Sequence, residues 1–366
     1  KAMESEDFPD LPHFPEGSPF EDFFEEFMER KNGMPMAPQA SLGSGFVIDA
    51  ENGYIITNNH VVKDAEEIRI TFQDDETIPA ELIGIDEKTD LDYVMFLVKQ
   101  SYLLACSIKA TQRTNNATCL ITNEIVPEEY KKVFDYIVDI PWSDDAKESK
   151  WKIENRWKIY HATPFDENIV LDTDMLILED IEHWWKYLDS YDLYFTTNVR
   201  TFRDRPITEG MWHYRKAFIR YDLPKIYVGV HYFKKSDLAH KFYKWLEFIN
   251  QNWEMFYGEF AGGNAFQKWA SIDVSSAIAI KLLGISSQVT NSISDIPKFV
   301  HMKTYHQGVS NLHNSWQGYV NSYIDDELNL RIGNYKQNGI FHYVEDSFVT
   351  DSLIEKYEGY LSKNEF

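Results

Sequence analysis

The stretch Ile-Val-Leu-Asp-Thr-Asp-Met-Leu-Ile-Leu occupies residues 169–178 and holds two carboxylates inside an apolar run. Residues 169–171 have the length and the β-branched content of a buried strand. Because side chains alternate along a strand, Asp172 and Asp174 are expected to emerge on the same side of it. Two charges beside a buried strand need a positive partner. The stretch therefore predicts a cation site at the carboxyl end of a strand.

Asp172 and Asp174 are candidate ligands of a divalent metal ion. Mg²⁺ and Mn²⁺ take oxygen ligands and are usually held by one or two carboxylates together with the phosphates of a substrate. In an open α/β sheet, ligands bind outside the carboxyl ends of the strands. The sequence thus predicts a Mn²⁺ or Mg²⁺ site that faces a diphosphate. The alternative is a turn capped by two acids, and Asp90-Leu91-Asp92 has the same spacing without the flanking apolar runs.

Charge is distributed unevenly along the 366 residues, whose formal net charge is −23. Residues 1–91 contain 6 Lys and Arg against 22 Asp and Glu, whereas the remaining residues contain 30 against 37. This shift predicts two segments of different origin that join near Leu91 and Asp92. The acidity argues against a nucleic-acid or anionic-membrane binder. No apolar run is long enough to predict a membrane span, and Cys106 and Cys119 lack metal-ligand spacing.

The first segment is expected to hold an acidic lead followed by β structure. Residues 1–40 form the predicted lead, which begins with many prolines and acids and contains a short amphipathic helix near residues 20–27. In residues 41–91, short apolar runs with frequent turns are typical of an antiparallel barrel or sandwich. The expected strands are residues 43–49, 54–62, 68–72 and 81–85.

Three blocks of the first segment are specific in combination: LGSGFVID at residues 42–49, YIITNNHVV at 54–62 and KTDL at 88–91. On these blocks the segment resembles the HtrA/DegP family of trypsin-like serine proteases. The resemblance implies that His60 is a general base and that Asp90 orients it. This chemistry needs a serine beside an oxyanion hole, and the sequence contains no Gly-x-Ser-Gly-Gly block. We therefore expect a truncated segment in which His60 and Asp90 are an inactive remnant of a protease site.

Residues 92–366 are expected to fold as one α/β domain. Strand and helix periodicities alternate, which predicts a mostly parallel sheet with helices on both faces. Right-handed crossovers then bring the carboxyl ends of the strands to one rim, where we expect a nucleotide to bind. The expected strands are residues 93–98, 117–122, 136–140, 169–171, 192–197 and 225–233. The expected helices are residues 102–113, 127–134, 148–161, 181–188, 236–255 and 265–283.

With this order of elements, the residues around Asp172 and Asp174 resemble the metal-dependent glycosyltransferases of the GT-A fold, of the glycogenin and lipopolysaccharide galactosyltransferase type. The likeness covers about residues 92–366. It implies a Rossmann-type GT-A fold that uses Mn²⁺ or Mg²⁺. It also implies transfer of a sugar from a nucleotide-sugar donor to a hydroxyl group of a glycan, lipid or protein acceptor. A cytoplasmic location would follow for this part, and a periplasmic one for the HtrA-like part.

The same resemblance implies a histidine that completes the metal coordination. The first candidate is His342 and the second is His301, although a histidine on an apolar strand is often a core residue. Such enzymes also place a basic residue before the metal strand in contact with the donor. Arg156 stands at the matching position, and its alternative reading is an exposed helix charge.

Further contacts with the nucleotide-sugar donor are expected from residues that lie in different parts of the sequence. These are Lys99, Tyr102 and Lys303, with Lys336 as another candidate partner of the diphosphate. Asp273 is the catalytic candidate, because it is an acid among apolar residues. It is expected either to hold an acceptor hydroxyl or to bond a neighbouring backbone group or arginine.

Two other readings of the whole chain stay open. The first is a fragment of an HtrA-type serine protease or chaperone, which the missing Gly-x-Ser-Gly-Gly block argues against. The second is a chimeric sequence of two unrelated genes, because the two resembled families work in different compartments.

Overall fold

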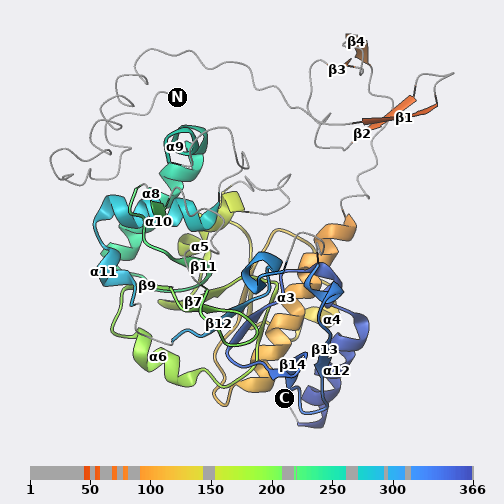
Figure 1. Ribbon diagram of the computed structural model, residues 1–366, viewed down its shortest axis with the longest axis vertical. Coiled ribbons are helices and arrows are strands. Elements are labelled where there is room, and N and C mark those ends of the chain that lie inside the picture. The colour runs from red at the N-terminus through yellow and green to blue at the C-terminus, as the bar shows by residue number, and fades with distance from the viewer. Residues whose placement is uncertain are drawn as a thin grey trace. The chain divides into compact units, whose positions relative to one another are not determined.

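The computed structural model describes strands within residues 45–80 and most of residues 91–364 (Figure 1). The described ranges are residues 45–49, 54–57, 68–71, 77–80, 91–142, 153–207, 218–219, 221–260, 271–291, 296–309 and 315–364. The chain forms two compact units: the described residues up to Met95 belong to the first, and those from Phe96 onward belong to the second. The predicted helix near residues 20–27 and the predicted strand at residues 81–85 lie outside the described residues.

The first unit contains two antiparallel strand pairs. Strand β1 (Gly45–Asp49) pairs with β2 (Tyr54–Thr57), and β3 (Ile68–Thr71) pairs with β4 (Thr77–Ala80). Three of these strands fall where the alternation of apolar residues predicts them. The pairs form separate two-stranded sheets among the described residues, so a barrel stays a prediction.

Two larger sheets organise the second unit. In one, β11 (Tyr227–Lys234) lies between β7 (Glu167–Leu171) and β9 (Leu193–Thr196) and is antiparallel to both. The other has the order β10-β12-β16-β8, in which the first two pairings are parallel and the last is antiparallel. Its strands are β8 (Met175–Ile177), β10 (Val199–Arg200), β12 (Phe299–His301) and β16 (Ile340–His342).

Smaller sheets and helices complete the second unit. Strands β5 (Cys119–Ile121) and β6 (Tyr136–Val138) are parallel, and β13 (Ser322–Ile324), β14 (Leu330–Ile332) and β15 (Tyr335–Lys336) form an antiparallel meander. The helices are α3 (Leu91–Thr111), α4 (Glu128–Lys131), α5 (Ile159–Ala162), α6 (Glu182–Leu188), α8 (Asp237–Gln251), α9 (Trp253–Phe260), α10 (Ile272–Leu283), α11 (Ser286–Val289) and α12 (Asp351–Lys363).

The predicted strand at residues 93–98 is wrong, because these residues form the beginning of α3. Aromatic and β-branched residues in this stretch favour a strand locally. No Gly or Pro separates them from the helical pattern that follows, so one continuous helix forms instead. The predicted helix at residues 148–161 is also shorter in its described part, where a 3₁₀ turn, Ile153–Lys158, leads into α5.

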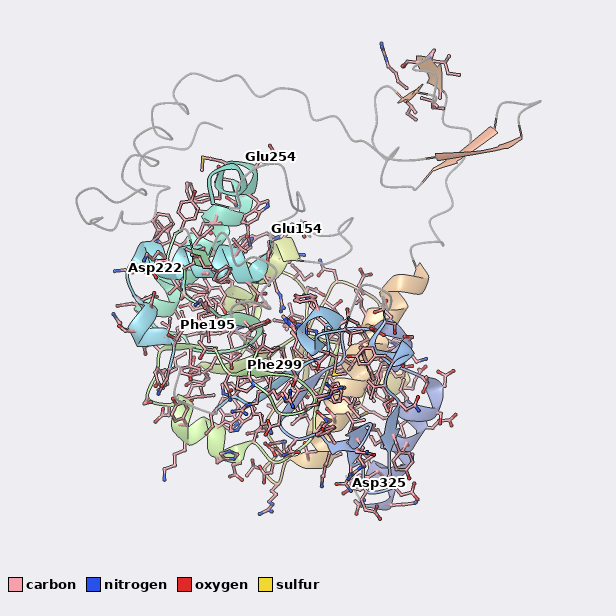
Figure 2. The ribbon with its side chains drawn as sticks, in the orientation of Figure 1. Glu154, Phe195, Asp222, Glu254, Phe299 and Asp325 are labelled. Atoms are coloured by element: carbon pink, nitrogen blue, oxygen red, sulfur yellow. The ribbon has the colours of Figure 1, made fainter. Side chains whose placement is uncertain are left out.

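The β10-β12-β16-β8 sheet separates two apolar cores. Because side chains alternate along β8, Leu176 enters one core while Met175 and Ile177 enter the other. Helices α3 and α12 pack on the Leu176 face, and α6 packs on the opposite face with Trp184. The labelled Phe299 accordingly lies deep in this unit (Figure 2) and is fully buried. The sheet therefore holds the residues that directly precede β8 and the last residue of β16 in fixed positions.

Helices α3 and α12 lie side by side although they are far apart in the sequence (Figure 1). The Tyr102 hydroxyl donates a hydrogen bond to Glu358 over 2.6 Å, and Lys99 pairs with Asp351. Within the described part of the chain, no helix is both long and apolar enough to cross a membrane.

Trp316 provides a test of the core on the α12 face of the sheet. It is fully buried, and its Nε1 donates a hydrogen bond to the Tyr343 carbonyl over 2.7 Å. Trp316→Phe should lower the free energy of unfolding by about 2–4 kcal/mol, because it leaves a cavity and an unsatisfied carbonyl. Trp142→Phe is the control, since Trp142 is 69% exposed and its replacement should change stability by about 0.5 kcal/mol or less. Equal losses in urea unfolding of the two variants would contradict this core.

Candidate functional site

Asp172, Asp174 and His342 form the candidate site. The two acids lie in the turn between β7 and β8, and His342 is the last residue of β16. Antiparallel pairing of β8 with β16 places His342 opposite Met175, the residue after Asp174. One ligand atom from each of the three side chains lies within 4.8 Å of the others. Residues 168 positions apart in the sequence are thus brought together by one strand pairing.

Hydrogen bonds hold the turn that carries the two acids. His342 Nε2 lies 2.7 Å from Asp174 Oδ2, and the backbone N–H of Tyr343 donates to the Asp174 carbonyl over 3.2 Å. The Thr173 hydroxyl donates to Gln100 of α3 over 3.4 Å. The side chain of Asp174 is still 24% exposed. A ligand from solvent can therefore reach a carboxylate that is otherwise fixed.

Asp172 is held from two sides. Its carboxylate forms an ion pair with Arg156, and its backbone N–H donates to the Gly229 carbonyl over 3.0 Å. A Cβ atom on Gly229 would lie 2.7 Å from Asp172 Oδ2 and 2.9 Å from the Met175 side chain. Only glycine leaves room for the carboxylate at this point of β11. Sequence reasoning missed this residue, although a lone glycine inside the apolar run of residues 225–233 is a signal of close approach.

The electrostatics of the site favour an ionised Asp174. Burial opposes its charge, but the charge and the hydrogen bond of His342, with a smaller contribution from Lys303, lower the pKa of Asp174 below its usual value. Lys303 is exposed and its charge acts on Asp174, and its predicted contact with a donor stays a prediction. The site thus keeps a carboxylate charged at neutral pH.

His301 lies against His342, with 4.5 Å between the ring centroids. Its Nδ1 accepts a hydrogen bond from the backbone N–H of Lys303 over 3.2 Å. Burial, together with the neighbouring His342, lowers the pKa of His301 well below its usual value. His301 is therefore a neutral, fully packed histidine behind His342.

Asp273 bonds a backbone group, which is one of the two alternatives that the sequence left open. Its Oδ1 accepts a hydrogen bond from the backbone N–H of Val228 over 2.9 Å. Burial raises the pKa of Asp273, although the Val228 hydrogen bond and the charges of Lys303 and Arg156 act in the opposite direction. Asp273 therefore lies in the electrostatic surroundings of the site and anchors the start of β11.

Several predicted site residues are not brought to the acids. Lys99 and Tyr102 are bonded to α12, and Tyr102 also stacks on Tyr130 with 4.2 Å between the ring centroids. Lys336 lies on β15, where its charge acts on Asp325. The proposed protease pair, His60 and Asp90, lies outside the described residues.

Comparisons with known proteins concern the first part of the chain. A model of the trypsin-like peptidase domain family matches residues 43–119. A probable periplasmic serine endoprotease of DegP-like type from Chlamydia pneumoniae is 42% identical over 83 residues, which is 21% of this chain and 17% of that protein. Similar DegP-like proteins from Pseudomonas fluorescens (41% over 98 residues, 25% of this chain and 19% of that protein) and Ectopseudomonas mendocina (46% over 88 residues, 23% and 18%) also match.

The chain spans less than a fifth of the length of these relatives. The matches confirm the HtrA-like resemblance of the first segment, and the family match continues past Leu91 to residue 119. The predicted glycosyltransferase function and the predicted transferase class of enzyme are contradicted, because the family and the relatives found are trypsin-like serine peptidases. An Asp-x-Asp pair beside a histidine indicates a cation, and it does not identify a reaction.

Gly229→Ala tests the packing that seats Asp172. The added methyl group meets a carboxylate oxygen and the Met175 side chain, so we expect a loss of about 1–3 kcal/mol in the free energy of unfolding from overpacking. Gly359→Ala in α12 is the matched control, because no atom lies within 4 Å of the added Cβ and alanine favours a helix by about 0.5–1 kcal/mol. If Gly229→Ala were as stable as the parent chain, the described contact would be wrong.

Proposed function

We propose that this chain carries a fragment of an HtrA-type serine peptidase. The observation that supports this proposal is the match of residues 43–119 to the trypsin-like peptidase domain. The matched range contains His60 and Asp90 in the blocks NNHVV and TDL. The relatives are probable periplasmic serine endoproteases, and a periplasmic location is therefore part of the proposal for this segment.

Peptide hydrolysis needs three groups that act as a unit. A histidine removes the proton from a serine hydroxyl, an aspartate orients that histidine, and backbone N–H groups stabilise the oxyanion that forms. His60 and Asp90 supply the first two roles in this proposal. The sequence has no Gly-x-Ser-Gly-Gly block to supply the nucleophile and the oxyanion hole. The fragment is therefore expected to be competent only when a serine-bearing segment completes the domain.

Completion of the domain tests this proposal. Residues 120–366 are replaced by the serine-bearing remainder of the DegP-like protein of Chlamydia pneumoniae, and casein hydrolysis is measured. The fusion should cleave casein, and His60→Ala in the same fusion should lower kcat by about 10⁶-fold, as the loss of a triad histidine does. The unmodified chain should not cleave casein.

Two outcomes would contradict the fragment assignment. A folded fusion without activity would show that residues 43–119 do not supply a working base. Casein cleavage by the unmodified chain that disappears in His60→Ala would show that the chain contains its own nucleophile. Asp92→Asn in the fusion is the control, because Asp92 lies outside the matched TDL block and its loss should leave cleavage unchanged.

A second function, divalent cation binding, is favoured by the group of Asp172, Asp174 and His342. We propose that these side chains hold Mn²⁺ or Mg²⁺. Two carboxylates and an imidazole are suitable donors for such ions. The three ligand atoms lie within 4.8 Å of one another, so small side-chain movements bring all of them to a common ion at roughly 2.0–2.3 Å.

The present partners of the ligands fit this second proposal. Asp172 is paired with Arg156 and Asp174 with His342. His342 Nδ1 is buried and has no hydrogen-bond partner in the described part of the chain. Within these residues the ring therefore hydrogen-bonds through Nε2, to Asp174. A cation would replace the positive charge of Arg156 at Asp172 and take the ring nitrogen of His342. It would supply Lewis-acid stabilisation to an anionic ligand.

Alanine variants of His342 and His301 test which of the two histidines binds the metal ion. His342→Ala should weaken Mn²⁺ binding by about tenfold or more, because one donor is lost. His301→Ala is the matched control, since His301 is buried beside His342 and its Nδ1 is occupied by a backbone N–H. Mn²⁺ binding is measured by the loss of the free-ion signal in electron paramagnetic resonance. A larger effect of His301→Ala would move the site away from His342.

A further inference from the structure

The turn that follows β10 concentrates positive charge on an acidic protein. Arg200, Arg203 and Arg205 stand in the seven residues 200–206, in a chain with a net charge of −23. Lys298, which precedes β12, lies beside the same turn and bonds Asp204 with 3.1 Å between Nζ and Oδ1. This turn and its neighbour Lys298 thus contribute four cations and the carboxylate of Asp204.

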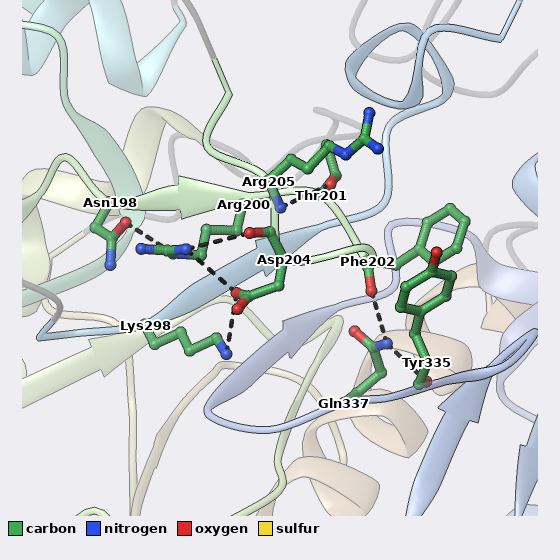
Figure 3. Close-up of polar contacts among 9 residues, drawn as sticks. All are labelled: Asn198, Arg200, Thr201, Phe202, Asp204, Arg205, Lys298, Tyr335 and Gln337. Atoms are coloured by element: carbon green, nitrogen blue, oxygen red, sulfur yellow. Dashed lines mark hydrogen bonds and ion pairs between the residues drawn. The ribbon is translucent and has the colours of Figure 1, made fainter.

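Asp204 is contacted by Arg200 and Lys298 (Figure 3). Arg200 Nη1 donates to the Asp204 carbonyl over 3.2 Å and lies 3.4 Å from its Oδ1, the same oxygen that Lys298 contacts. Asp204 stands between Arg203 and Arg205 in the sequence. The structure shows that the carboxylate is instead satisfied by Arg200 and Lys298.

Arg203 and Arg205 consequently keep their charges available to solvent. Both are exposed, and no carboxylate of the described residues forms an ion pair with either one. Figure 3 shows the Arg205 side chain directed away from Asp204. The Arg203 guanidinium lies over the Phe202 ring, 4.8 Å from its centroid. This contact limits the conformations of Arg203 without neutralising it.

The turn itself is fixed by hydrogen bonds across its ends. The Thr201 N–H donates to the Arg205 carbonyl over 2.9 Å, and the Arg205 N–H donates to the Thr201 hydroxyl over 3.2 Å. The Asp204 N–H donates to the Thr201 carbonyl over 3.0 Å. The Phe202 carbonyl accepts from Gln337 Nε2 over 3.0 Å (Figure 3). The two exposed arginines are therefore presented by a rigid support, which reduces the entropy lost when a ligand binds.

We propose that residues 201–205 bind an oxyanion of the phosphate type through Arg203 and Arg205. A guanidinium group donates two parallel hydrogen bonds to such an anion, and two guanidinium groups match a group that carries more than one negative charge. Asp204 does not compete, because Arg200 and Lys298 occupy its carboxylate. The proposal uses none of the residues of the cation site and does not depend on either proposed function.

Tripolyphosphate is the probe, and the full-length chain is titrated with it by calorimetry. EDTA is present throughout, so that a metal ion held by Asp172 and Asp174 cannot contribute. The parent chain should bind, and the double variant Arg203→Gln/Arg205→Gln should bind about tenfold more weakly or worse, because charge-assisted hydrogen bonds are lost. Lys132→Gln/Lys186→Gln is the control, since it removes the same charge from two other exposed positions.

Lys298→Gln tests whether Lys298 keeps the Asp204 carboxylate from pairing with Arg203 and Arg205. Without Lys298, the carboxylate regains freedom to pair with Arg203 or Arg205, so tripolyphosphate binding should weaken although neither arginine is changed. Unchanged binding by Lys298→Gln would contradict this account of the turn. An absence of binding by the parent chain, or an equal loss in the lysine control, would overturn the site.

Chemical labelling of the parent chain tests the site without any variant, so misfolding of a variant cannot affect the result. Phenylglyoxal modifies exposed arginines, and peptide mass spectrometry locates the modified residues. Tripolyphosphate should protect Arg203 and Arg205 and leave Arg113, which is 86% exposed, as reactive as before. Equal labelling of Arg203 and Arg205 with and without tripolyphosphate would overturn the proposal. Addition of inorganic phosphate and of a sulfated disaccharide to parallel samples distinguishes phosphate from sulfate ligands.

Discussion

The two carboxylates that follow strand β7 need positive charge close to them, and this need is met by contacts between distant segments of the second unit. Asp172 forms an ion pair with Arg156, which precedes β7, and Asp174 forms a hydrogen bond with His342 at the end of β16. Each pairing joins segments that the sequence separates. The antiparallel contact of β8 with β16 is required for the second pairing, and the apolar cores on both faces of that sheet stabilise it. The free energy gained by packing these apolar cores thus offsets the cost of placing the charges together.

Asp172, Asp174 and His342, which the structure brings together, were candidates from the sequence because their signals are local. Asp172 and Asp174 directly follow an apolar strand, and His342 lies in another short apolar run. The role of Gly229 was not predicted, because it depends on which strand lies beside β7. The pairing of Arg156 with Asp172 was not predicted either, because it depends on how the 3₁₀ turn Ile153–Lys158 packs. The helical state of residues 93–98 was missed for the opposite reason, since local strand preference there is overridden by the continuous helix α3.

Function was harder to predict than the site. The pattern of two acids and a histidine indicates a cation, whereas the assignment of a sugar-transfer reaction rested on resemblance alone and is contradicted by the peptidase matches. The turn of residues 201–205 also shows that the sequence alone does not predict which charges are available. Asp204 stands between Arg203 and Arg205 in the sequence, but its carboxylate contacts Arg200 and Lys298, and Arg203 and Arg205 are left available. Charge balance therefore has to be read from contacts in space.

The central proposal is that Asp172, Asp174 and His342 form one cation site. Anomalous diffraction from crystals grown with Mn²⁺ tests it most directly. The account predicts an anomalous peak at roughly 2.0–2.3 Å from a carboxylate oxygen of each acid and from a ring nitrogen of His342, with Arg156 displaced from Asp172. Crystals that contain Mn²⁺ but show no peak there, with Arg156 still paired to Asp172, would contradict the account.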